Sequence, residues 1–285
     1  MVTKLRNFLF GVMCCSLLLN SCDNTFEPFQ ENDQYNFSMY GTLDLHADTQ
    51  WVRVMPIQQS LLQERPESNE VTVTLIQEST GEEIEMHDSL FQFATDAFAW
   101  NYWDINADIN EGERYTVKAK GENGMGSSAT LTIPSNLDIP DVEYSENTEE
   151  ATVEGVARDS LVVLEARYLA QALVFPGCAP EREIVISHLS QTDIDPDGSY
   201  YLEFDNYRII ASRLGVTAGN YIINRRQLVV ITASDGWPDI GDLTDENVVL
   251  PEVGTNVENG TGQIAGIAKR VIEITPRRAP CESER

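Results

Sequence analysis

Three acidic residues and a glycine stand at close spacing in the segment Asp193-Ile-Asp195-Pro-Asp197-Gly198. Carboxylates at positions 1, 3 and 5 and glycine at position 6 match the opening of a calcium-binding loop. The match then ends, because position 12, where such loops carry a bidentate glutamate, is Phe204. A tight turn that leads into a strand accounts for the same residues. Two interpretations stay open: calcium bound by Asp193, Asp195 and Asp197, or a turn with its acids in solvent.

Aromatic side chains that could stack on sugar rings gather near residue 100 and in one polar loop. Trp100 and Tyr102 fall on one face of an expected strand and Trp103 on the other, while Trp51 and Trp237 lie elsewhere. An exposed ring offers a flat apolar surface to a ligand, whereas a tryptophan in the core of a β-sandwich needs no ligand. We take Trp237, Trp103 and Tyr102 as candidate ligand-binding residues of a glycan-binding module, with a core role as the alternative.

Signals for catalysis are few. The three histidines, His46, His87 and His188, are scattered, and the patterns HExxH, GxSxG, SxxK, GxxxxGK[ST] and GxGxxG are absent. With 46 Asp and Glu residues, some pair of carboxylates will lie close by chance, so the sequence does not single out a glycosidase-like site. We expect no enzymatic activity; a carboxylate-based hydrolase is the alternative.

The first 22 residues carry an export signal. Lys4 and Arg6 precede an apolar stretch at 8–19, which is too short for a stable membrane span. The stretch ends in LNSC, which resembles the signal of bacterial lipoproteins and implies cleavage before Cys22 and lipid on its thiol. The alternative is an ordinary secretory signal with an incidental cysteine. We expect a chain that is anchored to a membrane by lipid and does not span it.

Two cysteines remain besides Cys22 once the signal is removed, namely Cys178 and Cys281. An even pair in an oxidising compartment predicts one disulfide. It would close a loop of about a hundred residues, worth about 4–5 kcal/mol in the chain-entropy model. Two buried thiols are the alternative.

The formal net charge is -27 at pH 7, from 19 Lys and Arg against 46 Asp and Glu. Phosphate binding needs a basic footprint, so this charge excludes nucleic acid as a partner. The hydrophobic fraction of 42% supplies a core and excludes a mainly disordered chain. We interpret the charge as a solvated, extracytoplasmic surface.

Short alternating segments position these residues. Between 35 and 133, period-two alternation recurs with turn signals roughly every 8–12 residues, which is typical of a sandwich. The rest of the chain is also strand-rich, with one helix expected at 205–214. The fold class is therefore all-β. The predicted parts are a signal peptide (1–21), an acidic tether (22–34), an immunoglobulin-like or fibronectin-like β-sandwich (35–136) and a second β-rich domain (137–285).

Four features of the sequence together resemble one protein family. They are the lipid signal, a TGEE turn, the hairpin ERYTVKAKGENG that is followed by TIP, and the segment NVENGTGQIAG. The chain resembles the two-domain bacterial lipoproteins of the domain-of-unknown-function 4249 type, encoded near TonB-dependent transporters. The resemblance covers most of the mature chain. It implies an outer-membrane lipoprotein, periplasmic or surface-exposed with the surface favoured. It carries no catalytic residues over.

Taken together, these features predict a lipid-anchored envelope protein with a non-enzymatic binding or accessory role. The resemblance implies a TonB-dependent uptake system as the setting, with a transporter, another envelope protein or a glycan as partner. We expect no cofactor unless the acidic segment binds calcium.

Overall fold

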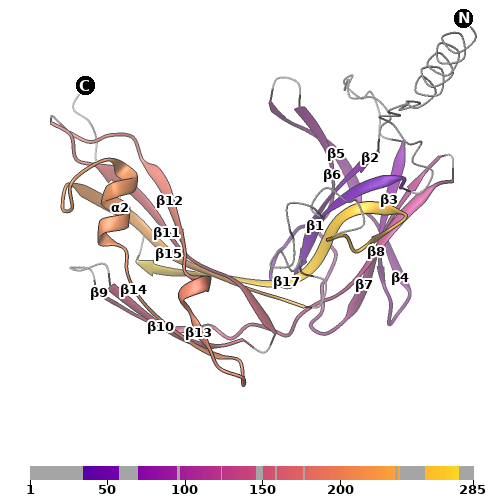
Figure 1. Cartoon of the computed structure of the whole chain (residues 1–285). Helices are drawn as coiled ribbons and strands as arrows, with labels where there is room; N and C mark the ends of the chain where they lie inside the picture. The colour runs from indigo at the N-terminus through magenta and orange to yellow at the C-terminus, as the bar shows by residue number, and fades with distance from the viewer. Residues whose placement is uncertain are drawn as a thin grey trace, which may run out of the picture. The chain divides into compact units, whose positions relative to one another are not determined.

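The computed structural model describes residues 35–57, 70–94, 97–122, 124–145, 150–157, 159–175, 177–234, 237 and 254–275. All of them belong to the compact unit Gln34–Arg285. They form an all-β fold with one α-helix within these ranges, which confirms the predicted fold class (Figure 1). Within the same ranges no helix is long and apolar enough to cross a membrane.

Three sheets make up the fold. The eight-stranded sheet runs β12 (Arg182–Ser187), β11 (Ser160–Ala172), β15 (Tyr221–Ala233), β17 (Gly260–Thr275), β1 (Phe37–Asp44), β2 (Gln50–Pro56), β6 (Ala97–Asp104) and β5 (His87–Ala94). The five-stranded sheet runs β16 (Val257–Glu258), β8 (Gly126–Thr132), β7 (Arg114–Gly121), β3 (Val71–Gln77) and β4 (Glu82–Glu85). The four-stranded sheet runs β13 (Asp193–Ile194), β14 (Ser199–Asp205), β10 (Glu150–Val156) and β9 (Asp141–Ser145).

The first sandwich packs the five-stranded sheet against one face of β1, β2 and β6. Alternation decides which side chains enter its core, because successive residues of a strand point to opposite faces. Met39 of β1 and Val54 of β2 are buried, and so are Leu75 of β3 and Val117 of β7. Burying each such side chain contributes about 1.5–3 kcal/mol, so this core is the main source of stability for the first sandwich.

The second sandwich packs the four-stranded sheet against β11 and β15. Leu164 and Tyr168 of β11 and Leu228 of β15 meet Val153 of β10 and Leu202 of β14 in one buried cluster. β11 runs without a break from Ser160 to Ala172, although its apolar residues also fit helical spacing in part. The helix α2 (Tyr207–Leu214) lies where the sequence predicts it and ends at Gly215 in the left-handed conformation.

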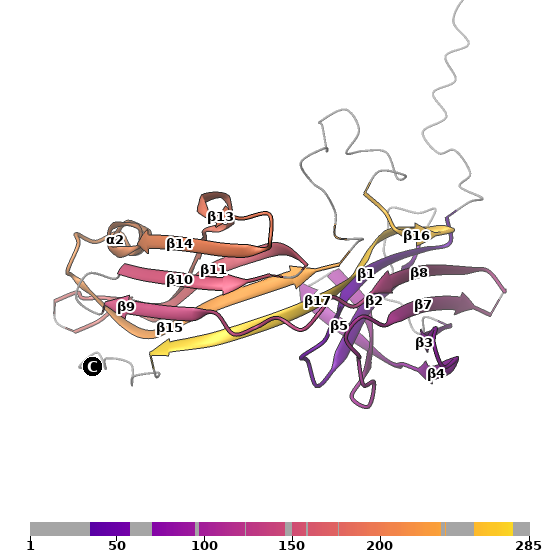
Figure 2. The same cartoon turned by 90° about the horizontal axis from the view of Figure 1, so that it is seen from below.

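One strand, β17, takes part in both sandwiches. Its first half pairs in parallel with β1, from Phe37–Gly260 to Asp44–Ile267, and its second half pairs antiparallel with β15. Figure 2 shows it as one long yellow arrow between the two sets of strands. Ile264 lies in the first core and Ala268 in the second. Residues 260–267 therefore complete the first sandwich, although they lie within the predicted second domain.

The glycine-rich segment NVENGTGQIAG has a structural explanation in β17. Gly262 adopts a φ of +111°, and a Cβ there would overlap the carbonyl oxygen of Met39. A Cβ on Gly266 would overlap the carbonyl oxygen of Thr132, where the end of the five-stranded sheet passes over β17. The segment is glycine-rich because other backbone lies directly against it.

Replacing Gly262 with alanine tests this close approach. We expect Gly262→Ala to lower the free energy of unfolding by about 2–5 kcal/mol, from left-handed strain together with overpacking against β1. Urea denaturation measures the loss. The matched control is Gly81→Ala, because Gly81 has a φ of +71° with nothing within 4 Å of the added Cβ. Equal losses in the two variants would contradict the argument.

Candidate functional site

A row of rings lies on the outer face of the first sandwich. Trp51 of β2 is the cross-strand partner of Trp103 of β6, which is in turn opposite His87 of β5. The ring centroids of Trp51 and Trp103 are 6.0 Å apart with planes 32° apart, and those of Trp103 and His87 are 5.2 Å apart. Trp51 is 47% exposed, and His87 is exposed. Since neighbouring strands are about 4.8 Å apart, this aromatic row offers a strip about 10 Å long.

The core of the first sandwich forces these rings outward. Tyr102, next to Trp103 in β6, is only 1% exposed, and its hydroxyl donates a hydrogen bond to the carbonyl oxygen of Val71 at 3.2 Å. Val52, next to Trp51 in β2, is also buried. Tyr102 is therefore a core residue, and its prediction as a ligand-binding residue is corrected. Trp103 does lie on the opposite face, as predicted.

Hydrogen-bonding side chains flank the aromatic row. In the next register of the sheet, Arg53 is opposite both Tyr40 and Asn101, and Asn101 is opposite Ser89. Tyr40 is 52% exposed. We call the outward residues of these two registers the platform, and none of them is acidic: Thr42, Trp51, Trp103, His87, Tyr40, Arg53, Asn101 and Ser89.

The outer face of the four-stranded sheet has the opposite character. Its exposed acids are Asp141, Glu143, Glu150, Glu154, Asp193, Glu203 and Asp205. Two cross-strand pairs, Glu154–Asp141 and Glu150–Asp205, place carboxylates directly opposite each other. Like charges in such pairs are destabilising. These seven acids lie on the second sandwich, whereas the platform lies on the first.

Within the segment Asp193–Gly198, Asp193 and Ile194 form β13, and residues 195–198 form the tight turn to β14. The amide of Asp195 donates to the carbonyl oxygen of Ser199 at 2.8 Å. The amide of Gly198 donates to the carbonyl oxygen of Asp195 at 2.9 Å. Hydrogen bonds from the Ser199 hydroxyl and amide hold the pKa of the Asp197 carboxyl below its usual range. Among the described residues no three acidic, histidine or cysteine side chains are arranged to hold a metal ion. The turn accounts for the segment, and calcium at Asp193, Asp195 and Asp197 stays a prediction.

The remaining predicted residues lie elsewhere. Trp237 is half-buried, and its amide donates to the carbonyl oxygen of Ser234 at 3.3 Å; it belongs to neither register of the platform. Cys178 is buried. Its predicted partner Cys281 and the predicted lipidation site Cys22 both lie outside the described residues.

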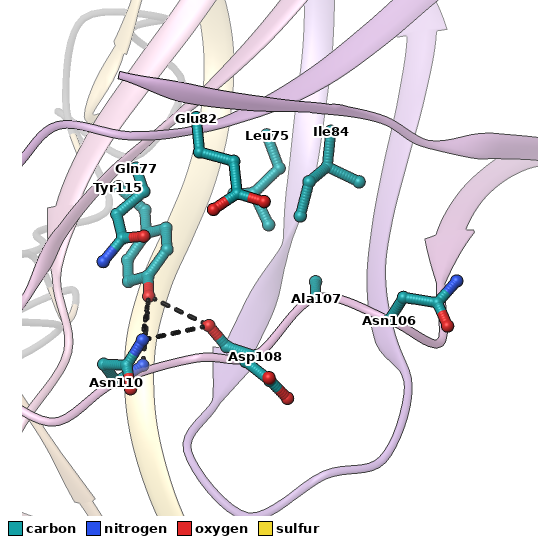
Figure 3. Close-up of a pocket in the computed structure, with 9 residues that line it drawn as sticks. All are labelled: Leu75, Gln77, Glu82, Ile84, Asn106, Ala107, Asp108, Asn110 and Tyr115. Carbon is teal, nitrogen blue, oxygen red and sulfur yellow. Dashed lines mark hydrogen bonds between the residues drawn. The ribbon is translucent and has the colours of Figure 1, made fainter. Parts of the chain in front are cut away.

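A pocket of about 220 Å³ opens in the first sandwich beside β3 and β4 (Figure 3). The Tyr115 hydroxyl accepts a hydrogen bond from the amide of Asn110 at 3.0 Å and donates one to the carbonyl oxygen of Asp108 at 3.2 Å. A tyrosine at the start of a strand that bonds backbone a few residues upstream is the tyrosine corner of immunoglobulin-like sandwiches. The pocket is smaller than typical ligand sites, and its polar contacts stabilise the fold.

A buried polar group lies in the second core, and sequence reasoning missed it. The side-chain amide of Asn206 donates to the Tyr168 hydroxyl at 2.8 Å and lies 3.1 Å from Nε2 of His188. The His188 ring stacks on Phe204, with centroids 4.3 Å apart. His188 is 2% exposed, and burial lowers the pKa of its imidazole. The only sequence signal is the alternation of EREIVISHL, which points His188 inward.

The three histidines do not meet. His87 belongs to the aromatic row, His188 lies in the second core, and His46 lies in the turn after β1. The described geometry therefore gathers them into no acid–base group.

Comparisons with known proteins identify no family. No family model matches the chain, and no curated protein does. A pullulanase from Anoxybacillus sp. LM18-11 has 12% identity and a TM-score of 0.24, covering 70% of this chain and 24% of its own. A DUF4785 family protein from Legionella pneumophila has 12% identity and a TM-score of 0.23, covering 68% of this chain and 51% of its own. The chain thus spans about half or less of these proteins, and scores this low carry no argument about function.

The buried imidazole of His188 predicts a pH dependence of stability. Its pKa in the folded chain lies below the ordinary value of 6.5, so at lower pH the unfolded chain takes up a proton that the folded chain refuses. The contribution of neutral His188 to the free energy of unfolding is complete above the pKa of the imidazole in the unfolded chain. It is lost progressively as the pH falls below that pKa toward the lower pKa of the folded chain. We subtract the free energy of unfolding of His188→Gln from that of the wild type. We expect this difference to decrease as the pH is lowered from 7.5 to 5.5.

Urea denaturation of both proteins at each pH measures this difference. Carboxylates and His46 titrate in both proteins, so their contributions cancel in the subtraction. A difference that stays constant over this range would show that His188 keeps its ordinary pKa on folding.

Proposed function

We propose that this chain is a lipid-anchored envelope protein with a non-enzymatic binding role, and that the platform is its recognition surface. The observation that carries the proposal is the outward-facing pair Trp51 and Trp103. Trp51 is 47% exposed and Trp103 is half-buried, so both keep apolar area in water that burial would stabilise by about 25 cal/mol per Å². Exposed apolar patches rimmed by polar residues mark interaction sites on soluble domains.

The contrast between two sheet faces supports the same site. The chain has 46 acids among 285 residues, yet no outward residue of the platform is acidic. The outer face of the four-stranded sheet carries seven exposed acids. A face without carboxylates, on so acidic a chain, suits a ligand that stacks on rings and accepts or donates hydrogen bonds.

The location rests on the N-terminal sequence. The segment LNSC before the tether supports lipid on Cys22, and the family resemblance favours the outer membrane with surface exposure, near a TonB-dependent transporter. We also propose that Cys178 pairs with Cys281, which agrees with an oxidising compartment. The carboxylate-based hydrolase stays a prediction.

Replacing Cys22 tests the anchor. In the native host, the full chain carrying Cys22→Ala should move from the membrane fraction to the soluble fraction, because the thiol that bears the lipid is gone. Immunoblotting of the fractions measures the shift. Cys15→Ser is the matched control, since that residue leaves with the signal. Retention of Cys22→Ala in the membrane fraction would contradict lipid anchoring at this residue.

Oxidative footprinting tests the platform even while its ligand is unidentified. On intact cells that display the protein, we expect oxidation of Trp51 and Trp103 to fall several-fold relative to the purified protein, because a bound ligand covers the rings. Mass spectrometry of the peptides measures the oxidation. Tyr201, 44% exposed on the four-stranded sheet, is the internal control and should be unchanged. Equal oxidation of both tryptophans in the two samples would refute the platform as the recognition surface.

A further inference from the structure

We propose that the ligand of the platform is a neutral polysaccharide, bound with its sugar rings stacked across Trp51 and Trp103. This inference rests on the proposed function, because it names the ligand of the same surface. Three features carry it: the shape of the aromatic row, the side chains beside it and the charge of the chain.

The shape of the row suits a flat ligand with an apolar face. The ring centroids of Trp51 and Trp103 are 6.0 Å apart with planes inclined by 32°, and the His87 ring lies 5.2 Å from Trp103 at 49°, so three neighbouring rings form one aromatic cluster on the outward face. A sugar ring presents C–H groups on its face and hydroxyls at its edge. Stacking buries the C–H face on the indoles while the hydroxyls stay at the rim.

The side chains beside the row suit the hydroxyls. Asn101 offers both an amide donor and a carbonyl acceptor, and the Tyr40 hydroxyl does both. The Ser89 hydroxyl donates to the backbone carbonyl of Asn101 at 3.4 Å and offers an acceptor, and Arg53 offers donors only. All four stand in the register next to the aromatic row. A sugar hydroxyl is itself both donor and acceptor, so this mixed set matches a polyhydroxyl ligand better than it matches a purely apolar one.

Charge decides between neutral and charged ligands. A chain of net charge -27 repels polyanions at long range, so uronate or sulfate polymers are disfavoured. A cationic ligand or partner would find seven exposed acids on the four-stranded sheet and none on the platform. A neutral ligand is what remains for a surface that combines rings, amides and hydroxyls.

The position of the row favours a polymer. Trp51 and Trp103 lie on β2 and β6, which are flanked by β1 and β5. The strip of about 10 Å crosses three neighbouring strands of one sheet face, so it can contact successive units of a chain of sugars. The platform therefore binds units within a polysaccharide and does not depend on a chain terminus.

Affinity electrophoresis of the full chain tests the inference. The gels contain soluble neutral α-glucan, β-glucan, mannan or galactan, with polygalacturonate as the charged counterpart. We expect at least one neutral polymer to retard the protein, with an affinity lowered by about tenfold or more in Trp51→Ala and in Trp103→Ala, since stacked aromatic residues are typical binding hot spots. Trp51→Phe, which keeps a ring, should retain most of the affinity.

Tyr201→Ala is the matched control, because it removes an equally exposed ring from the other sandwich and should leave retardation unchanged. Urea denaturation confirms that each variant is folded. Retardation by polygalacturonate alone, or retardation that both tryptophan variants retain, would overturn the inference. If no neutral polymer binds but Trp51 and Trp103 are protected on cells, the carbohydrate inference fails and the recognition surface stands. If no neutral polymer binds and Trp51 and Trp103 are also unprotected on cells, the carbohydrate inference and the proposed recognition surface both fail.

Discussion

The hydrogen-bond pairing of β17 with two different strands is the constraint on which the rest of the structure depends. One continuous strand of 16 residues borders β1 along its first half and β15 along its second. Ile267 is the residue where the two pairings meet, because it is opposite both Asp44 and Ala233. Without β17, β1 would be an edge strand, with unpaired backbone groups beside the strands that carry the platform. The first sandwich is thus completed by residues more than 200 positions away in the chain.

The platform is a consequence of how the first core is packed. Because side chains alternate along a strand, burying Val52 and Tyr102 places Trp51 and Trp103 on the opposite face. The antiparallel register then brings the two indoles opposite each other, with Arg53 and Asn101 one step along the sheet. Shifting β6 by one residue would bury Trp103 and expose Tyr102. The recognition surface therefore depends on the same register that builds the core.

Much of the fold is predictable from the sequence, because alternation and turn residues are local. The strands around residues 37–44, 71–77 and 114–132 and the helix before Gly215 lie where periodicity predicts them. The sequence does not reveal the pairing of β1 with β17, because a parallel contact between distant segments leaves no local pattern. For the same reason it does not reveal that Trp51 and Trp103 are cross-strand partners. The glycine-rich segment NVENGTGQIAG stands out in the sequence, but the crowding of backbone against Gly262 and Gly266 is visible only in the fold.

Hydrogen exchange measured by mass spectrometry across a urea series tests the shared strand most directly. Peptides from β3 and β7 report on the first sandwich, and peptides from β10 and β14 report on the second. If β17 joins the two cores into one cooperative unit, both groups of peptides become exposed at the same urea midpoint. Two clearly separated midpoints, with β17 exchanging together with only one sandwich, would contradict the account.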